Sequence, residues 1–259
     1  PWNHRIRSKG KGDNLFVCSV VALNATTGEY KWHYQFNPGE SWDYNAVADM
    51  ALADLKIDGQ MRKVMMTAPK NGFLYVIDRT NGKLISAIPS AKITWATGVD
   101  LKTGRPIENP DARYPNGKSF VLWPGSNGSH SVHAMSFSPK TGLVYLPTYN
   151  IPVTYSARGI DEANWKRPPT FLLDGGATID VGDAESRADP EYGKSYLTAW
   201  NPTTQAQVWR VPIVSIVNGG TMATAGNLVF QGHADGTFNA YAADTGKKLW
   251  SMDSGTAVD

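Results

Sequence analysis

Apolar and polar residues alternate along most of the chain in short stretches, which end in Gly, Asn, Asp or Thr. This pattern predicts β-strands over residues 63–68 and 72–78, and it divides residues 222–231 into strand, turn and strand. No stretch combines capping residues with a sustained 3.6-residue period, so no helix is predicted. The pattern therefore indicates an all-β protein.

An eleven-residue unit recurs along the chain. A strand ends at a small residue, Asn or Asp with Thr and Gly makes a tight turn, and a second strand carries Trp. Glycine supplies the positive φ that such a turn can require. Copies occupy residues 22–32, 76–86, 199–209 and 240–250, with a looser fifth copy at 137–145. The copy at 76–86 lacks the Trp, and the copy at 199–209 has Gln205 in the glycine place.

The copies lie roughly 40 to 60 residues apart, which is typical of a four-stranded propeller blade with insertions. The sequence thus predicts a β-propeller of four-stranded antiparallel blades, with the repeated Trp packed between neighbouring blades. Residues 98–104 are interpreted as an insertion hairpin, and residues 157–194 as a long insertion within one blade. Residues 1–259 are predicted to form a single, partial propeller domain.

Composition narrows the possible partners. Lys plus Arg number 25 and Asp plus Glu 23, so the net charge of +2 gives no reason to expect nucleic acid. No apolar run is long enough to span a membrane. The single cysteine, Cys18, can form neither an internal disulfide nor a CxxCH haem site, and is predicted to be buried in a strand over residues 15–22. No glycine-rich phosphate loop supports a nicotinamide cofactor.

The stretch at residues 38–45 has an unusual composition. A Pro-Gly turn leads to Asp43, which stands between Trp42 and Tyr44. Aromatic neighbours exclude water and raise the pKa of a carboxyl group, which suits a general base. Asp43 is therefore a candidate base, and the alternative is an ordinary turn aspartate.

Several segments together carry a family resemblance that extends over nearly the whole chain. They are residues 1–3, 12–15, 42–44, 69–72, 78–82 and 219–230. With these segments the chain resembles the pyrroloquinoline quinone (PQQ)-dependent alcohol dehydrogenases of the methanol/ethanol dehydrogenase family, which are eight-bladed quinoprotein propellers.

The resemblance implies the chemistry. Asp43 matches the catalytic aspartate, the general base that takes the alcohol proton while hydride moves to C5 of PQQ. Lys70 matches a cation on the ortho-quinone oxygens, where it would stabilise negative charge that develops during hydride transfer. The alternative for Lys70 is an ordinary hairpin lysine.

The family also implies a hard divalent metal, Ca²⁺ in most members, which acts as a Lewis acid on the PQQ carbonyl. Asp43 is the candidate metal ligand in this chain. Members that use a lanthanide carry a further aspartate two residues on, where this chain has Asn45, so Ca²⁺ is favoured. His130 and His133 have no Cys or third His nearby in sequence, which argues against a metal site there.

The sequence departs from the family pattern at residues 128–135. Many members have His-Asn-Trp where this chain has His130-Ser131-Val132. Ser131 is a candidate for contact with PQQ, through a shorter hydrogen-bonding side chain. Asn218 falls on a loop that faces the cofactor in the family, and the alternative is a turn asparagine.

The expected function is oxidation of a small primary alcohol, with electrons passed to cytochrome c in the periplasm. The alternative is a non-enzymatic propeller scaffold, as in outer-membrane assembly factors, which has no need for Asp43 or Lys70. Both ends of the chain resemble mid-domain sequence, so a fragment is expected. Expressed alone, it is expected neither to bind PQQ tightly nor to turn over.

Overall fold

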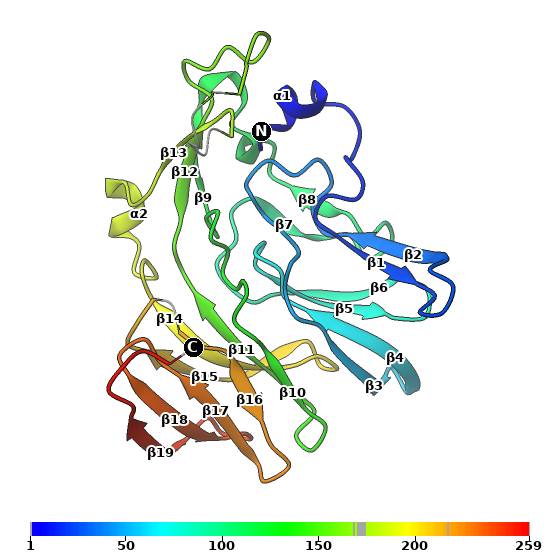
Figure 1. Ribbon diagram of the computed structural model, residues 1–259, viewed down its shortest axis with the longest axis vertical. Coiled ribbons are helices and arrows are strands. Elements are labelled where there is room, and N and C mark those ends of the chain that lie inside the picture. The colour runs from blue at the N-terminus through cyan, green and yellow to red at the C-terminus, as the bar shows by residue number, and fades with distance from the viewer. Residues whose placement is uncertain (1, 168, 170–174, 217, 259) are drawn as a thin grey trace.

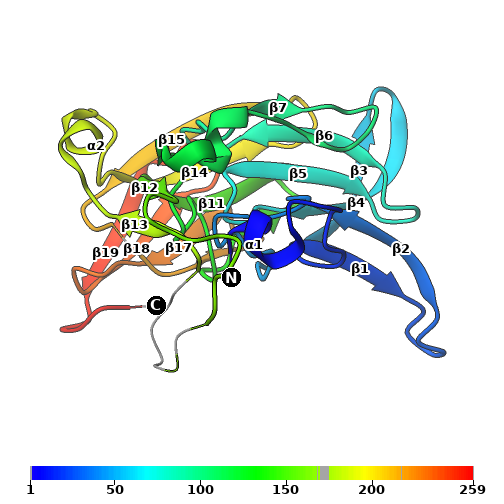
Figure 2. The same ribbon diagram turned by 90° about the horizontal axis from the view of Figure 1, so that it is seen from above.

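The computed structural model describes residues 2–167, 169, 175–216 and 218–258. Pro1 of the family segments and residues 168 and 170–174 of the long insertion lie outside these described residues. Three sheets each have four antiparallel strands, and within each sheet the strands lie side by side in sequence order. This arrangement confirms the predicted propeller fold. Figure 1 shows the blades following one another around an arc, and Figure 2 places β2 and β19 toward its opposite ends.

Four blades can be followed. Blade A consists of β1 (Ser19–Leu23) and β2 (Tyr30–Gln35). Blade B consists of β3 (Ala51–Ile57), β4 (Gln60–Thr67), β5 (Phe73–Asp78) and β6 (Leu84–Pro89). Blade C consists of β10 (Ser136–Ser138), β11 (Leu143–Tyr149), β14 (Ser195–Asn201) and β15 (Ala206–Ile213). Blade D consists of β16 (Thr221–Ala223), β17 (Leu228–Gly232), β18 (Thr237–Ala242) and β19 (Lys248–Asp253).

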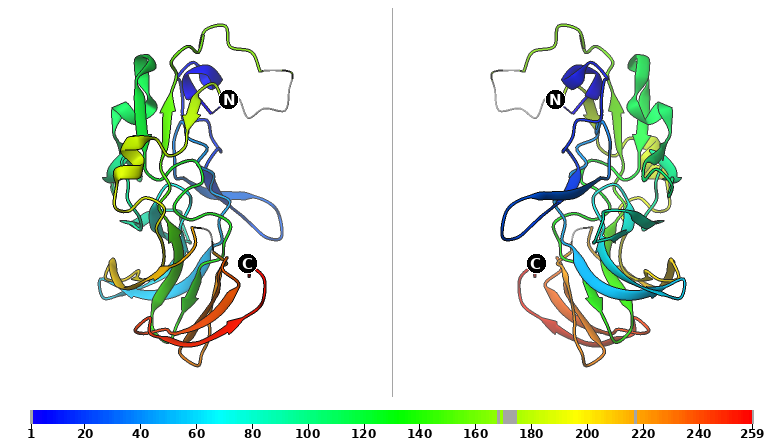
Figure 3. Two further views of the ribbon diagram at one scale, coloured as in Figure 1. Left: turned by 90° about the vertical axis from the view of Figure 1, so that its left-hand side faces the viewer. Right: turned by 90° about the vertical axis from the view of Figure 1, so that its right-hand side faces the viewer.

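Further elements lie outside the blades. The hairpin of β7 (Ala96–Val99) and β8 (Pro106–Glu108) contains the turn predicted at residues 98–104. Short 3-10 turns follow at Pro110–Arg113 and Pro115–Gly117. β9 (Ser119–Leu122), β12 (Val153–Ser156) and β13 (Thr178–Asp180) form a three-stranded sheet above the blades (Figure 3). Residues 150–194 run between the paired strands β11 and β14. The single-domain assignment stays a prediction.

The prediction of no helix was wrong at two short places. α1 (His4–Ser8) and α2 (Ala184–Ala188) are each five residues long, and Asn3 and Asp183 cap them by accepting backbone N–H groups. A helix this short has no room for the sustained apolar period on which the prediction depended. Among the described residues, no helix has the length and apolar character needed to cross a membrane.

Tryptophan docking joins neighbouring blades. Trp32 of blade A donates its indole N–H to Arg79 O at 3.1 Å, and a Cβ on Gly82 would lie 2.7 Å from its ring. Trp209 of blade C donates to Ala243 O at 3.0 Å, and a Cβ on Gly246 would lie 2.6 Å from its ring. Glycine is therefore needed at this repeat position for two reasons: the backbone has a positive φ, and the indole of the preceding blade lies too close for a side chain.

The joint between blades B and C is built differently. Ser86 stands in the Trp place of blade B, and Gln205 stands in the glycine place of blade C, so both halves of the docking contact are missing there. Buried Trp200 instead joins the apolar cluster that blades B and C share. Gln205 keeps the left-handed turn with φ 58°.

The prediction of a fifth repeat copy at residues 137–145 was wrong. The Gly142 turn joins β10 and β11, the first two strands of blade C, whereas the other four turns each precede the outermost strand of a blade. Those four copies share a register shift at equivalent positions beside the turn, and the pairing of β10 with β11 has none. The local sequence encodes a tight turn, which either strand pair can use.

Candidate active site

Asp43 lies between β2 and β3, in the left-handed region with φ 61°. Its neighbours Trp42 and Tyr44 are 0% and 2% exposed, whereas the Asp43 side chain is 41% exposed. The Trp42 ring packs on Trp95 with 5.3 Å between centroids. The two aromatic residues thus anchor the backbone in the core and leave the Asp43 carboxylate half exposed.

Lys70 follows β4 and meets Asp43. Its Nζ donates to Asp43 O at 3.2 Å and lies 3.8 Å from Asp43 Oδ2, and its side chain is 11% exposed. Partial burial raises the pKa of Asp43, while the Lys70 charge and a hydrogen bond from Trp2 act to lower the pKa. Asp43 is therefore a carboxylate that can accept a proton, and it lies beside the fixed cation of Lys70.

The segment that carries Asp43 is held by side chains along its whole length. Its backbone carbonyls at residues 38–44 all accept hydrogen bonds from side chains distant in sequence, rather than from a β-ladder. The donors are Arg113 to Pro38 (3.1 Å) and Gly39 (2.7 Å), Arg7 to Glu40 (2.5 Å), Tyr114 to Ser41 (2.9 Å), Tyr155 to Trp42 (2.8 Å), Lys70 to Asp43 (3.2 Å) and Cys18 to Tyr44. Such full pairing preorganises the segment.

Two of these donors show how the segment is held. Arg113 stacks over the Trp42 ring at 5.1 Å and is oriented by Glu108, which accepts from its Nε at 2.7 Å and its Nη2 at 2.8 Å. Cys18 is buried as predicted, but it lies just before β1 with φ 51° rather than within a strand. Burial raises the pKa of its thiol, so the thiol stays protonated and can donate to Tyr44 O.

Ser131 belongs to a loop that packs on Lys70. Ser129 N donates to Lys70 O at 3.2 Å, and a Cβ on Gly128 would lie 2.6 Å from Lys70 Cα. The close approach of this loop therefore requires glycine. Ser131 is half buried, and Val132 is 72% exposed.

Asn218 is 6% exposed, and its side-chain amide forms hydrogen bonds with backbone groups. Its Nδ2 donates to Ser215 O at 2.7 Å, and its Oδ1 accepts from Ala234 N at 3.4 Å. These contacts fit the turn-asparagine interpretation. The structure thus brings Asp43 and Lys70 together and gives Asn218 local partners.

The histidine pair offers no open metal site. The ring nitrogens of buried His130 lie 2.5 Å from Ala68 O and 2.7 Å from His133 O. Within the part of the chain that the structure describes, no group of three or more His, Cys, Asp or Glu could hold a metal. Since Ca²⁺ takes six to eight oxygen ligands, Asp43 can supply only part of a shell. The carboxylate and the Lys70 ammonium do fit the base and the quinone-binding cation.

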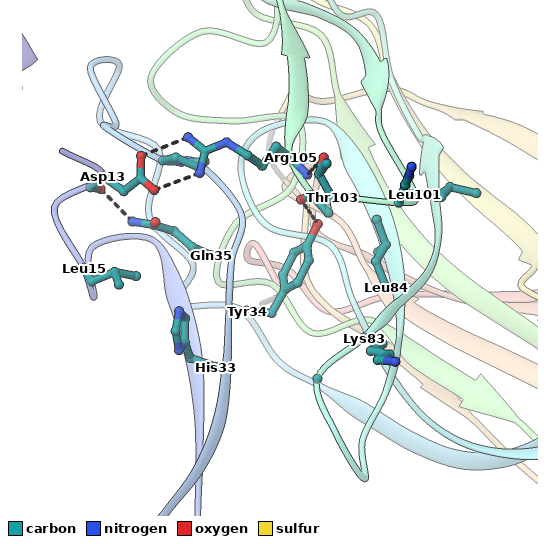
Figure 4. A pocket seen from close by; sticks show the side chains of 14 residues that line it. Asp13, Leu15, His33, Tyr34, Gln35, Lys83, Leu84, Leu101, Thr103 and Arg105 are labelled. Carbon is teal, nitrogen blue, oxygen red and sulfur yellow. Dashed lines mark hydrogen bonds and ion pairs between the residues drawn. The ribbon is translucent and has the colours of Figure 1, made fainter. Parts of the chain in front are cut away.

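A polar cavity of about 440 Å³ lies apart from these residues, between β2 and the β7–β8 hairpin (Figure 4). At the edge of this cavity, Arg105 forms a bidentate ion pair with Asp13, with N–O distances of 2.8 and 2.9 Å. Tyr34 donates to Gly104 O at 2.7 Å and closes one wall. Asp43 and Lys70 do not line this cavity.

Comparisons with known proteins decide the family. The sequence family described as glucose/ethanol/alcohol dehydrogenase, beta-propeller domain matches residues 4–100, and that of the outer membrane protein assembly factor BamB matches residues 188–258. Quinohemoprotein alcohol dehydrogenase ADH IIB of Pseudomonas putida is 48% identical over 100% of this chain and 36% of its own length. Over its whole length the chain is similar to PQQ-dependent alcohol dehydrogenases.

Solved structures agree with this PQQ-dependent dehydrogenase fold. The quinohemoprotein alcohol dehydrogenase ADHIIG of Pseudomonas putida superposes with a TM-score of 0.92 at 47% identity, over 99% of this chain and 38% of its own. A europium-containing methanol dehydrogenase superposes with a TM-score of 0.85 at 32% identity, over 99% of this chain and 43% of its own. The chain thus spans well under half the length of these relatives.

Most residues that hold Asp43 carry no mark in the sequence. Arg113, Tyr114 and Tyr155 follow Asp43 by 70 or more residues, and no local pattern marks them as its supports. Glu40 is different, because it stands inside the same stretch and is a carboxylate at 3% exposure. Its position two residues before a buried Trp could have singled it out.

Proposed function

We propose that this chain forms the part of a PQQ-dependent alcohol dehydrogenase that carries the general base, Asp43, and the quinone-binding cation, Lys70. The observation that carries the proposal is the contact of Lys70 Nζ with Asp43, at 3.2 Å to O and 3.8 Å to Oδ2. A half-exposed carboxylate against a largely buried ammonium is an arrangement that a scaffold does not need. Whole-chain similarity to alcohol dehydrogenases supports the proposal.

In this mechanism, Asp43 accepts the hydroxyl proton of a primary alcohol at its carboxylate. Its raised pKa makes it a stronger base than an ordinary aspartate, and the charge of Lys70 favours its ionised form. PQQ, when bound, supplies the acceptor for the hydride that leaves the alcohol carbon. The Lys70 ammonium, which Asp43 O holds in place, would bind the quinone oxygens.

The proposed metal is Ca²⁺, with Asp43 giving one carboxylate ligand. Asn45 is exposed and adds no negative charge beside Asp43, which favours a divalent over a trivalent ion. One similar structure is a europium-containing methanol dehydrogenase, so a lanthanide is the alternative to be tested.

We also propose a small primary alcohol as substrate, cytochrome c as electron acceptor and the periplasm as location. One relative, from Thauera butanivorans, is named 1-butanol dehydrogenase (cytochrome c), and it is 45% identical over 100% of this chain and 37% of its own length.

The test uses the full-length protein reconstituted with PQQ and either Ca²⁺ or a lanthanide, with dye-linked alcohol oxidation as the assay. Asp43→Asn is expected to lower kcat by about 10²–10⁴-fold, the usual contribution of a general base. Asp54→Asn, which removes an exposed partner of Arg79, is the matched control and should keep wild-type activity.

Two results would contradict the proposal, and a third would change its metal. A wild-type protein that oxidises no alcohol with either metal would favour the scaffold alternative. An Asp43→Asn variant with most of its activity would remove Asp43 as the base. A rate with the lanthanide alone would replace Ca²⁺ by that ion.

A further inference from the structure

Glu40 is a buried carboxyl group that lies three residues before the proposed base. It is 3% exposed. One of its oxygens, Oε1, accepts the backbone N–H of Trp42 at 2.5 Å and that of Tyr44 at 2.9 Å. The two amides belong to the residues on either side of Asp43. Glu40 therefore binds the backbone on both sides of the proposed base with a single atom.

The backbone between these two amides adopts a costly conformation. Asp43 has φ 61°, in the left-handed region that a non-glycine residue rarely occupies because it strains the backbone. Such a conformation persists only where the surroundings enforce it. The side chains on the carbonyls of residues 38–44 hold one side of the segment, and Glu40 holds the amides.

The charge of Glu40 is also set by its surroundings. Burial, with a smaller contribution from the Asp43 carboxylate, raises the pKa of Glu40 to about 7, against the hydrogen bonds from Trp42 and Tyr44 and the charge of Arg7. Because both amides bind Oε1, the other oxygen can take a proton without loss of either hydrogen bond. The titratable groups that face Glu40 are Arg7 in α1, Asp43, and the neutral side chains of Cys18, Tyr44, Tyr114 and Tyr155.

We propose that Glu40 is a positioning residue for Asp43: its Oε1 fixes the left-handed backbone that presents the carboxylate to Lys70 and substrate. The role rests on the proposed function of Asp43, but the backbone geometry can be measured without it. Glutamine retains an oxygen at the same place and removes the charge, whereas alanine removes the acceptor altogether.

The test compares Glu40→Gln and Glu40→Ala in the full-length protein. Crystal structures without cofactor should show φ of Asp43 still positive in the Gln variant, and shifted to the usual negative range in the Ala variant, with loss of the Lys70 contact. In the reconstituted enzyme, Glu40→Ala should lower kcat by about 10²-fold, the usual result of such a misplacement, while Glu40→Gln keeps most of it.

The pH profile gives a second measure. Glutamine keeps the oxygen that binds both amides, and a carboxyl group whose pKa is raised to about 7 carries little charge at acid pH, so the acid limb of kcat/KM in Glu40→Gln should stay near its wild-type pH. Trp209→Phe, which removes a hydrogen bond between blades C and D, controls for general destabilisation and should move neither the limb nor Asp43.

An unchanged positive φ of Asp43 in Glu40→Ala would overturn the proposal. If Glu40→Ala does not fold, Glu40→Met takes its place, because methionine keeps most of the volume and removes the oxygen acceptor: a negative φ of Asp43 in that variant supports the proposal, and a positive φ overturns it. A wild-type protein without alcohol oxidation would refute the proposed function, while the φ measurement would still test the positioning role.

Discussion

At the scale of single residues, two opposing effects act on the pKa of Asp43. Partial burial raises it, and the Lys70 ammonium lowers it. A base must be unprotonated to act, so the rate should rise with pH through the pKa of Asp43. The position of this acid limb then measures how much Lys70 contributes.

Lys70→Gln is therefore expected to move the acid limb of kcat/KM to higher pH, because the charge that lowers the pKa of Asp43 is gone. Lys70→Arg keeps the charge and should leave the limb near its wild-type position. The measurement is a pH profile of the reconstituted full-length enzyme. A limb at the same pH in Lys70→Gln and wild type would show that the contact carries no electrostatic effect.

Asp43 and Lys70 could be found from the sequence because each lies in a short segment with a recognisable composition. The structure brings them into contact, and their roles stay predictions. The supports of Asp43 could not be found this way. Arg113 and Tyr155 reach this segment only because the chain folds back. They bind backbone carbonyls, which every residue has, so the sequence does not mark these acceptors.

At the scale of elements, the repeat turn has two separable requirements. Gly82, Gly246 and Gly142 all have positive φ, but only Gly82 and Gly246 lie under an indole ring, and a Cβ on Gly142 would meet nothing within 4 Å. Gln205 adopts the same φ where no indole packs on it. The conformation is thus tolerable for other residues, and the docked Trp excludes them.

Gly82→Ala and Gly246→Ala are expected to lose about 1–2 kcal/mol of stability from the left-handed backbone, plus about 1–3 kcal/mol from the clash with the indole. Gly142→Ala should lose only the first part. Calorimetric melting of the full-length variants measures the difference. Equal losses at all three positions would mean that the indole moves aside freely.

Propeller strands and four of the five repeat turns were predictable because alternation and turn residues are local properties of the sequence. The place of the Gly142 turn was not, since a Thr-Gly turn has the same local sequence whichever strands it joins. The two short helices were missed for the opposite reason, as five residues carry too little periodicity.

At the scale of the whole molecule, the proposed site depends on more than this chain. The described residues contain no cluster able to hold a metal, and the chain spans 36% of a similar quinohemoprotein alcohol dehydrogenase. A partial metal shell binds weakly, because each missing ligand removes an oxygen from the ion.

Residues 1–259 expressed alone are therefore expected to bind PQQ and Ca²⁺ far more weakly than the full-length protein and to show no alcohol oxidation. Isothermal titration with PQQ, with and without Ca²⁺, measures the difference, and circular dichroism confirms that the β-structure is present. Affinity equal to that of the full-length protein would show that these residues suffice for the site.

The side-chain support of residues 38–44 has a consequence for laboratory evolution. Each carbonyl there is bound by a residue from another part of the chain, so a library that varies Arg113, Tyr114 or Tyr155 would disturb the proposed base at a distance. Residues just beyond the segment are freer: Val47 is 76% exposed and Met50 is 52% exposed. Diversity introduced at those two positions would sample new surfaces close to Asp43 while its backbone stays fixed.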